Sequence, residues 1–227
     1  MAKGTKFKRK ELNQPDQFIS TSDVVFAYCS NHKTALVSTI TAILLIVFSG
    51  LSIRYNQNIK NLRMESLYFK IEQIKAENSS SPEELIKKIE NLLHEFSEGP
   101  QKKRATMILA DQYYEIHAYD SAISLYRSIL TESDPTNLQY QLASVGIAYS
   151  LEGKKDYKGA IVAYKTIIES HNEYPLFHVY LRLARCYELN NNQNGALLTL
   201  REMNTRFINH PKIELVDSRI KNLDKSV

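Results

Sequence analysis

The residues that most often carry catalysis or bind metals are sparse in this sequence, and their spacing suits neither task. The six histidines and two cysteines include no His-x-x-x-His or Cys-x-x-Cys pair that could supply metal ligands. His171 and His178 could share a helix face, but Pro175 lies between them and interrupts a helix. We therefore expect no metal ion and no other cofactor.

Motifs for nucleotide binding and nucleophilic catalysis are also missing. The sequence has no glycine-rich phosphate loop and no Gly-x-Ser-x-Gly motif. Carboxylate pairs such as Glu83-Glu84 are explained by favourable charge in the first turn of a helix. We predict no catalytic residues and a protein that is not an enzyme.

Composition disfavours several fold classes and a nucleic-acid-binding surface. The 227 residues include only seven glycines, fewer than sandwiches, barrels or nucleotide-binding α/β folds use in their turns. Of the net charge of +4, residues 1–33 carry +3, with six Lys or Arg against Glu11, Asp16 and Asp23. The remaining chain is almost neutral, which argues against nucleic acid as a partner.

Residues 34–53 read TALVSTITAILLIVFSGLSI and contain no charged residue. At about 1.5 Å per residue, a helix of this length spans about 30 Å, the thickness of a bilayer core. Lys33 and Arg54 bracket the segment, where their long side chains can reach lipid headgroups. We predict a transmembrane helix rather than a buried core helix, because soluble helices of this length carry a polar face.

A cleaved signal peptide is the rival interpretation of this segment. It is disfavoured because a long polar stretch precedes the apolar residues and no small-x-small cleavage site follows them closely. The distribution of basic residues does not give a single orientation of the helix in the membrane. The whole tail is basic, yet near the span only Lys33 precedes it, whereas four basic residues follow it, namely Arg54, Lys60, Arg63 and Lys70. We expect the amino terminus inside and the carboxyl domain outside.

Residues 1–33 are expected to form a basic cytoplasmic tail. The cluster at residues 6–10 suits attraction to anionic lipid, whereas RNA binding is disfavoured because no aromatic platform or second basic patch accompanies it. A short amphipathic helix on the membrane surface could form from Phe18, Ile19, Val24, Val25, Phe26 and Tyr28.

Residues 54–100 are predicted to be a helical linker with capping helices. A helical stripe runs to about Glu77, and Ser81-Pro82 begins a second helix because serine caps the free amides and proline fits the first turn. We expect Gly99-Pro100 to end that helix.

From residue 101 the sequence repeats a frame of small and large residues. Each copy has a small residue followed three positions later by an aromatic, then a second alanine followed four positions later by a large residue. The first pairs are Ala110/Tyr113, Gly146/Tyr149 and Ala184/Tyr187, and the second pairs are Ala122/Tyr126, Ala160/Tyr164 and Ala196/Leu200. The two small residues are 12 positions apart in the first and third copies and 14 apart in the second. A two-residue insertion in the turn near Gly153 would explain the difference.

This frame resembles the tetratricopeptide repeat, a helix–turn–helix unit of about 34 residues. Small residues let the two helices touch, and large ones fill the grooves between neighbouring pairs. The resemblance implies an all-α protein, in which one transmembrane helix precedes an α-solenoid of about three repeats at residues 101–227. A closing helix is supplied by Ile213, Val216, Ile220 and Leu223.

The resemblance also implies a concave groove that binds a polypeptide, lined by the first helix of each repeat. By the family's frame, the groove-facing positions are Met107, Asp111, Tyr114, Ala143, Ile147, Ser150, Leu181, Arg185 and Glu188. Some such domains clamp a carboxyl terminus with Lys and Asn on the first repeat. Met107 and Asp111 stand there instead, and Asp111 would repel that ligand.

The whole arrangement resembles bacterial single-pass inner-membrane proteins with a periplasmic tetratricopeptide domain, such as the ancillary subunit of the Sec translocon. Arg9-Lys10-Glu11-Leu12, followed by Pro15-Asp16-Gln17-Phe18, is similar to the opening of many of them. This implies an inner-membrane location, a periplasmic domain, and protein partners such as the translocon, clients or chaperones, with lipid around the anchor. The alternative is a cytoplasm-facing membrane-tethered scaffold or regulatory adaptor.

Overall fold

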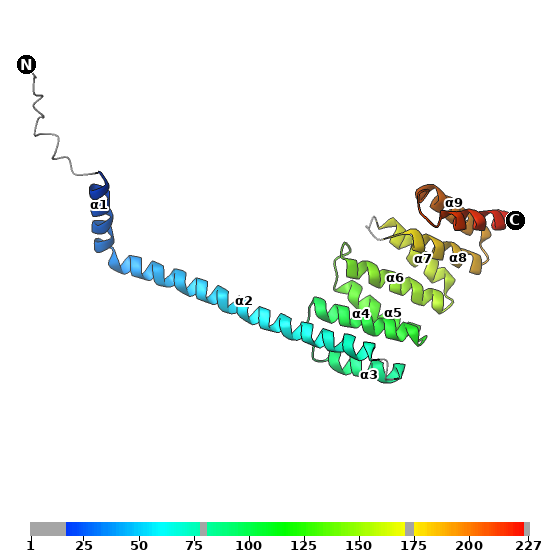
Figure 1. Ribbon diagram of the computed structural model, residues 1–227, viewed down its shortest axis with the longest axis horizontal. Coiled ribbons are helices and arrows are strands. Elements are labelled where there is room, and N and C mark those ends of the chain that lie inside the picture. Colours follow the sequence, from blue (N-terminus) through cyan, green and yellow to red (C-terminus); the bar gives the residue numbers. More distant parts are fainter. Residues whose placement is uncertain (1–16, 78–80, 171–174, 225–227) are drawn as a thin grey trace, which may run out of the picture. The chain divides into compact units, whose positions relative to one another are not determined.

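The computed structural model describes residues 17–77, 81–170 and 175–224, and these segments are helical apart from their connections, with no strand among them (Figure 1). Contacts divide the chain into two compact units, Met1–Lys60 and Asn61–Val227. The basic cluster at residues 6–10 and residues 9–16 of the opening motif, which runs to Phe18, lie outside the described residues.

The first unit contains α1 (Gln17–Asn31) and the beginning of α2 (Lys33–Ala76). From residue 23 to residue 60 every side chain is exposed except that of Leu36, which is half-buried. Helices are present both before the apolar segment and along it, as predicted. The apolar segment at residues 34–53 and the helical stripe predicted after Arg54 form one continuous helix, α2. Apart from Leu36, the apolar side chains along residues 34–53 are therefore exposed.

The second unit contains the end of α2 and eight further helices. They are α3 (Pro82–Leu93), α4 (Pro100–Glu115), α5 (Tyr119–Thr131), α6 (Leu138–Gly153), α7 (Tyr157–Glu169), α8 (Phe177–Leu189), α9 (Gln193–Arg206) and α10 (Ile213–Asp224). Helices α4–α5, α6–α7 and α8–α9 are the three hairpins, and consecutive hairpins lie side by side (Figure 1). The end of α2 packs with α3 and α4 around Met64, Tyr68 and Ile71.

The start of α3 is as predicted, but its end is not. The Ser81 hydroxyl accepts a hydrogen bond from the Glu84 amide at 3.3 Å, and Pro82 opens the helix. Helix α3 ends at Leu93 rather than at Gly99-Pro100. Pro100 instead begins α4, because proline at a first helical position loses no hydrogen bond that the helix needs.

The tight turns inside the three hairpins are identical in length and in their backbone hydrogen bonds. Each spans three residues, the middle one with positive φ: His117 at 62°, Lys155 at 65° and Asn191 at 58°. Each turn repeats the same two backbone bonds of a Schellman motif, such as His117 amide to Tyr114 carbonyl (3.0 Å) and Ala118 amide to Tyr113 carbonyl (2.9 Å). The predicted two-residue insertion near Gly153 is therefore wrong.

The equal turns correct the frame of the second hairpin. Counting back from each turn, the residue equivalent to Ala110 and Ala184 is Ala148, and all three are fully buried. Ala148 stands 12 positions before Ala160, as in the other two copies. Gly146, which the sequence frame used, is small for a different reason: a Cβ there would lie 2.5 Å from Cζ of Tyr126. It allows the first hairpin's second helix to approach α6.

Helix α10 closes the apolar side of the last hairpin, as predicted. Val216 is fully buried in the cluster that α7, α8 and α9 share, and Ile213, Ile220 and Leu223 pack against that cluster. The Arg219 guanidinium donates two hydrogen bonds of 3.0 Å to the Glu188 carboxylate of α8. Helix α10 is thus attached by apolar burial and by a two-bond ion pair.

Candidate functional site

The first helices of the hairpins, α4, α6 and α8, place three side chains each at equivalent positions. In the turn-aligned frame these are Met107, Asp111 and Tyr114 on α4, then Val145, Tyr149 and Glu152 on α6, then Leu181, Arg185 and Glu188 on α8. The sets on α4 and α8 are those expected from the sequence. The set on α6 differs because of the corrected frame.

The residues expected on α6 point elsewhere. A two-residue shift turns a helix by about 200°, so the expected set lies on nearly the opposite side of α6. Ala143 and Ser150 are fully buried, and Ile147 lines a separate hollow. These three residues therefore do not face the same side as Tyr114 and Arg185.

Four of the nine turn-aligned residues, contributed by α4, α6 and α8, line a hollow of 260 Å³ near the tight turns of the hairpins. Its lining includes Tyr114 and Arg185 from the expected set, and its other members are Tyr149, Glu152, Gly153, Lys155, Tyr157, Arg182 and Leu189. Lysine and arginine supply three positive charges and Glu152 one negative charge. The hollow therefore carries a surplus of positive charge among tyrosine rings.

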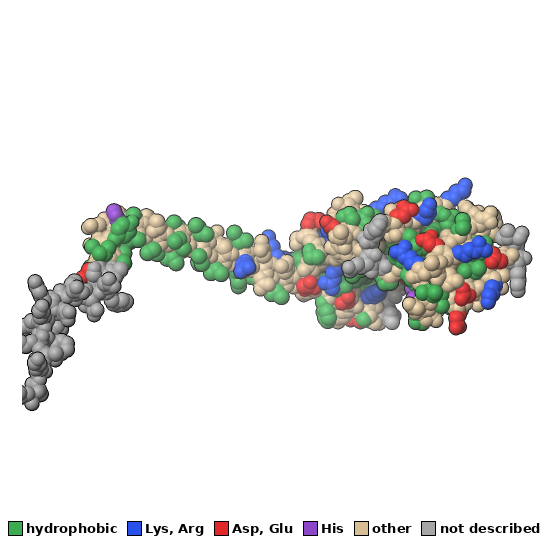
Figure 2. All heavy atoms as spheres, turned by 90° about the horizontal axis from the view of Figure 1, so that it is seen from above, with side chains coloured by type: hydrophobic (Ala, Val, Ile, Leu, Met, Phe, Trp, Pro, Cys, Tyr) green, Lys and Arg blue, Asp and Glu red, His purple; other side chains and the backbone are tan. Residues whose placement is uncertain are grey.

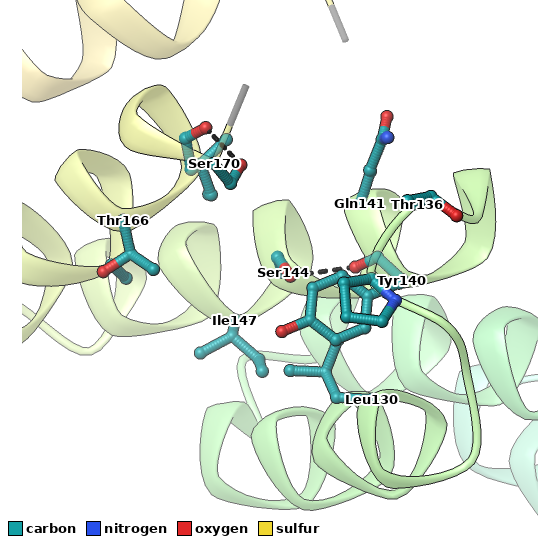
Figure 3. A pocket seen from close by; sticks show the side chains of 11 residues that line it. Leu130, Thr136, Tyr140, Gln141, Ser144, Ile147, Thr166 and Ser170 are labelled. Atoms are coloured by element: carbon teal, nitrogen blue, oxygen red, sulfur yellow. Dashed lines mark hydrogen bonds between the residues drawn. The ribbon is translucent and has the colours of Figure 1, made fainter. Parts of the chain in front are cut away.

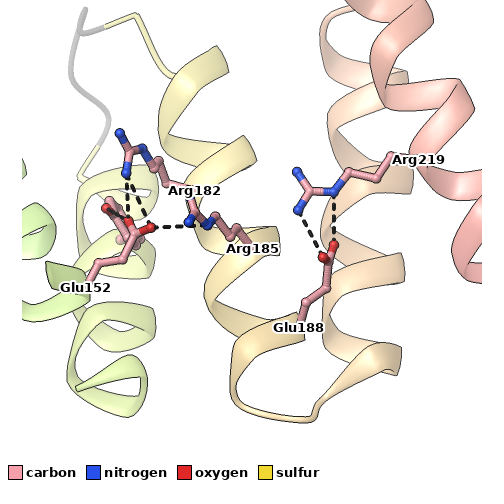
Figure 4. Close-up of polar contacts among 6 residues, drawn as sticks. Glu152, Arg182, Arg185, Glu188 and Arg219 are labelled. Atoms are coloured by element: carbon pink, nitrogen blue, oxygen red, sulfur yellow. Dashed lines mark hydrogen bonds and ion pairs between the residues drawn. The ribbon is translucent and has the colours of Figure 1, made fainter. Parts of the chain in front are cut away.

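Glu152 connects two arginines that line this hollow (Figure 4). Its side chain is only 8% exposed. Oε2 accepts a hydrogen bond from the Tyr164 hydroxyl at 2.8 Å, and both carboxylate oxygens lie 3.3 Å from Arg182 Nη1. Arg185 Nε lies further away, 3.7 Å from Oε1, and its side chain is 57% exposed. One buried carboxylate thus fixes Arg182 and leaves Arg185 largely available to solvent.

One aromatic ring lies against the Arg182 guanidinium, and burial raises the pKa of two nearby tyrosine hydroxyls. Arg182 Cζ lies 4.7 Å from the centroid of the Tyr149 ring, which is a cation–π distance. Burial, with the nearby Glu152 charge, raises the pKa of Tyr164 far above its usual value, so its hydroxyl remains a donor. Burial also raises the pKa of Tyr114. Tyr114 therefore offers a neutral hydroxyl to the hollow, and Arg182 offers a cation that Glu152 holds in place.

The other expected residues serve packing or pairing. Asp111 accepts a 2.5 Å hydrogen bond from the Tyr126 hydroxyl, and burial raises the pKa of this carboxyl. Glu188 is held by Arg219. Met107 and Leu181 pack against two of the apolar clusters. Sequence reasoning missed seven hollow residues, namely Tyr149, Glu152, Gly153, Lys155, Tyr157, Arg182 and Leu189. The 12-residue spacing from Ala148 to Ala160 was the signal that could have found Tyr149 and Glu152.

A second hollow, of 320 Å³, lies between α5, α6 and α7 and has no charged residue in its lining (Figure 3). Leu130, Tyr140, Ile147 and Ile167 supply its apolar surface, and Thr136, Gln141, Ser144, Thr166 and Ser170 its polar atoms. Ser144 donates its hydroxyl to the Tyr140 carbonyl at 2.8 Å. This hollow offers apolar contact but no charge to select a ligand.

Metal and thiol chemistry find no support in the part of the chain that the structure describes. No group of three or more His, Cys, Asp or Glu residues there could hold a metal ion. Cys186 is fully buried, and burial, with the Glu152 charge, raises the pKa of its thiol to about 12. It is therefore protonated near neutral pH and suits packing better than nucleophilic attack.

The apolar part of α2 is the other functional feature. Figure 2 shows hydrophobic side chains gathered along the helical part of the first unit, whereas charged side chains are spread over the second unit. The most apolar 18-residue window of α2 has a mean hydropathy of 2.3, and none of it is buried. This helix is long and apolar enough to cross a membrane.

Comparison with known proteins identifies the fold and no family. No family model matches the chain, and no curated protein matches it. Among solved structures it is similar to a putative kinesin light chain of Podosopora anserina with nearly identical TPR-like repeats, at 14% identity over 72% of this chain and 86% of that one, with a TM-score of 0.57. MamA from RS-1, as a double mutant, is similar at 15% identity over 72% of this chain and 96% of that one, with a TM-score of 0.49. The first of these likenesses and the hairpin geometry show a tetratricopeptide-like α-solenoid.

Proposed function

We propose that this chain is a membrane-anchored protein-binding module whose ligand is an acidic, extended polypeptide segment. The observation that carries the proposal is the hollow around Glu152, where three cations face one buried carboxylate. A carboxylate of the ligand that reached Arg185 and Lys155 would be paired without disturbing the bonds between Arg182 and Glu152. Tyr114, Tyr149 and Tyr157 would supply flat apolar contact for the ligand's side chains.

The anchor is the apolar part of α2. Its side chains meet no protein in the described structure, and the exposed apolar surface would be costly in water. A bilayer core covers that surface without leaving any backbone group unpaired, since the helix satisfies its own amides. Attachment also raises the effective concentration of the hollow toward partners at the membrane.

We further propose that the helical-hairpin unit faces the periplasm of a bacterium, near a machine such as the protein translocon. The basic tail and the resemblance to single-pass inner-membrane proteins support this orientation. A cytoplasm-facing scaffold is the second candidate, favoured by the four basic residues that follow the span. A reporter fused after Val227 separates them: phosphatase activity supports the first, and fluorescence of a cytoplasmic reporter without phosphatase activity contradicts it.

The hollow is tested by crosslinking in intact membranes. A photoreactive amino acid in place of Tyr149 is expected to crosslink to a polypeptide, and Arg185→Glu is expected to reduce that product strongly because it reverses the most solvent-exposed arginine charge of the hollow. Arg127→Glu is the matched control, since Arg127 is exposed on α5 and does not line the hollow. Equal crosslinking in both variants would assign the binding surface elsewhere.

A further inference from the structure

Two guanidinium groups and one buried hydroxyl surround the Glu152 carboxylate. The Tyr164 side chain is fully buried, and its hydroxyl donates to Oε2 of Glu152 at 2.8 Å. Arg182 Nη1 lies 3.3 Å from both carboxylate oxygens, whereas Arg185 Nε lies 3.7 Å from Oε1 (Figure 4). Glu152 is thus hydrogen-bonded to Tyr164 and Arg182, and Arg185 lies just beyond hydrogen-bond distance.

The small gap between Glu152 and Arg185 matters because a carboxylate has enough lone pairs to accept from both arginines. A shift of about 1 Å toward Arg185 would complete a charge-assisted hydrogen bond within the protein. That bond would occupy the guanidinium group and withdraw its charge from any ligand in the hollow. An opposing contact is therefore needed to keep the carboxylate away from Arg185.

The Tyr164 hydroxyl supplies that opposing contact. It reaches Glu152 from α7 and binds Oε2, whereas both arginines belong to α8 and Arg185 lies nearest to Oε1. The hydroxyl remains a donor because burial raises its pKa far above the usual value. A fully buried ring in a close-packed core has little room to follow a moving carboxylate. The arginine side chains, 39% and 57% exposed, are freer to adjust.

The first hairpin contains an equivalent tyrosine hydroxyl and a carboxylate, but no arginine beside them. Tyr126 stands four residues after the second alanine of its hairpin, as Tyr164 does, and donates to Asp111 at 2.5 Å. The charges that act on the pKa of Asp111 come from Lys75 and Glu115, not from an arginine. This pair therefore has no ligand-binding arginine to release, and it provides an internal control.

We propose that Tyr164 is a positioning residue of the ligand site: its hydroxyl holds Glu152 against the core and so keeps the Arg185 guanidinium free for a ligand carboxylate. This role rests on the proposed function of the hollow and adds the group that controls how strongly the hollow binds. Glu152 is an internal competitor of the ligand, because no other described residue that lines the hollow carries a carboxylate. A ligand can pair with Arg185 only while Tyr164 retains that competitor.

The test measures binding of a fluorescently labelled oligoglutamate peptide to the detergent-solubilised full chain, by fluorescence anisotropy at low salt. Tyr164→Phe removes only the hydroxyl and is expected to weaken binding roughly fivefold, the upper effect of one exposed charge pair. Tyr126→Phe is the matched control: it removes the equivalent hydroxyl beside Asp111 and should leave the affinity unchanged. Thermal unfolding of both variants, recorded in parallel, identifies any loss of the folded state.

A second substitution separates positioning from a general loss of structure. Glu152→Gln removes the competing charge, so Tyr164→Phe combined with Glu152→Gln is expected to bind the peptide at least as tightly as the unsubstituted chain. A merely structural role for Tyr164 predicts the opposite, because the added change removes the counter-ion of Arg182 and destabilises the fold further. Unchanged affinity in Tyr164→Phe, or no recovery in a folded double variant, would overturn the proposal.

Arg185→Glu distinguishes the positioning role from the proposed function on which it rests. If the hollow binds acidic segments, this reversal should weaken peptide binding strongly, whatever the effect of Tyr164→Phe. Equal binding by Arg185→Glu and the unsubstituted chain would overturn the proposed function and the positioning role together. Loss of binding in Arg185→Glu, with unchanged affinity in Tyr164→Phe, would reject the positioning role alone.

Discussion

The ring of Tyr126 on α5 lies so close to the backbone of Gly146 on α6 that a Cβ at residue 146 would be 2.5 Å from the ring's Cζ atom. This contact joins the first hairpin to the second. We predict that Gly146→Ala lowers the free energy of unfolding by about 1–2 kcal/mol, because overpacking outweighs the gain in helix propensity. Urea unfolding of the detergent-solubilised protein would measure it. Gly50→Ala is the control, since no heavy atom lies within 4 Å of its Cβ.

Glu152 is predicted to matter more for stability than Glu188, although each pairs with arginine. Glu152 is 8% exposed and also accepts the Tyr164 hydroxyl, whereas the Glu188 side chain is 27% exposed. Replacing Glu152 by Gln should cost about 1–3 kcal/mol, since a buried tyrosine loses a charged acceptor and Arg182 its counter-ion. Glu188→Gln should cost about 1 kcal/mol or less. Equal losses in chemical denaturation would contradict this ranking.

The Cys186 thiol predicts a loss of stability at alkaline pH. Its pKa is raised in the folded state to about 12, above the unfolded value of 9.0, so the unfolded chain loses its proton first. Stability from this group is complete below pH 9 and is lost as the pH rises toward 12. Denaturation midpoints should therefore fall over that window, and less steeply in Cys186→Ala. The same slope in both proteins would assign the effect to other groups, such as Tyr113, whose pKa its hydrogen bond to Glu90 raises to about 12.

The positive φ of Lys155 predicts opposite effects at two neighbouring lysines. Lys155 adopts φ of 65°, where a side chain is disfavoured, whereas Lys154 has φ of −69°. Lys155→Gly should raise the free energy of unfolding by about 0.5–1 kcal/mol, and Lys154→Gly should lower it by a similar amount. Thermal unfolding of the two variants side by side would show the difference, and a stabilised Lys154→Gly would contradict it.

The helix cap at Ser81 can be tested in the same way. Ser81→Ala removes the acceptor for the Glu84 amide and should cost about 1 kcal/mol. Ser124→Ala, at an exposed site inside α5, should leave stability unchanged or slightly higher, because alanine is the better helix former. A loss of equal size at both serines would exclude the cap as its cause.

The helices of the repeats could be predicted from sequence because their small and large residues recur at fixed spacing. The position of the groove on α6 could not, because Gly146 and Tyr149 imitate the small-then-aromatic pair of the other hairpins. Gly146 is small to admit a ring from the preceding hairpin, and Tyr149 supports Arg182. The spacing of small residues in one sequence does not show whether a small residue contacts the other helix of its own hairpin or a neighbouring hairpin. The backbone hydrogen bonds of the turns fix the alignment of the hairpins and so answer this question.

The role of Glu152 could not be predicted from the sequence either. Its partners Tyr164 and Arg182 are 12 and 30 positions away and lie on two other helices. No local pattern marks an acidic residue that is buried by such distant groups. The repeat frame could indicate that a groove exists, but the charge inside it depends on the side chains of three helices at once.

The three turns that share one hydrogen-bonding pattern all lie at the same end of their hairpins, and the hollow lies at that end too. The connections between successive hairpins, by contrast, differ in length at the opposite ends. Insertions and deletions there would leave the hollow intact. Changes in the length of those connecting loops are therefore not expected to alter the proposed binding surface.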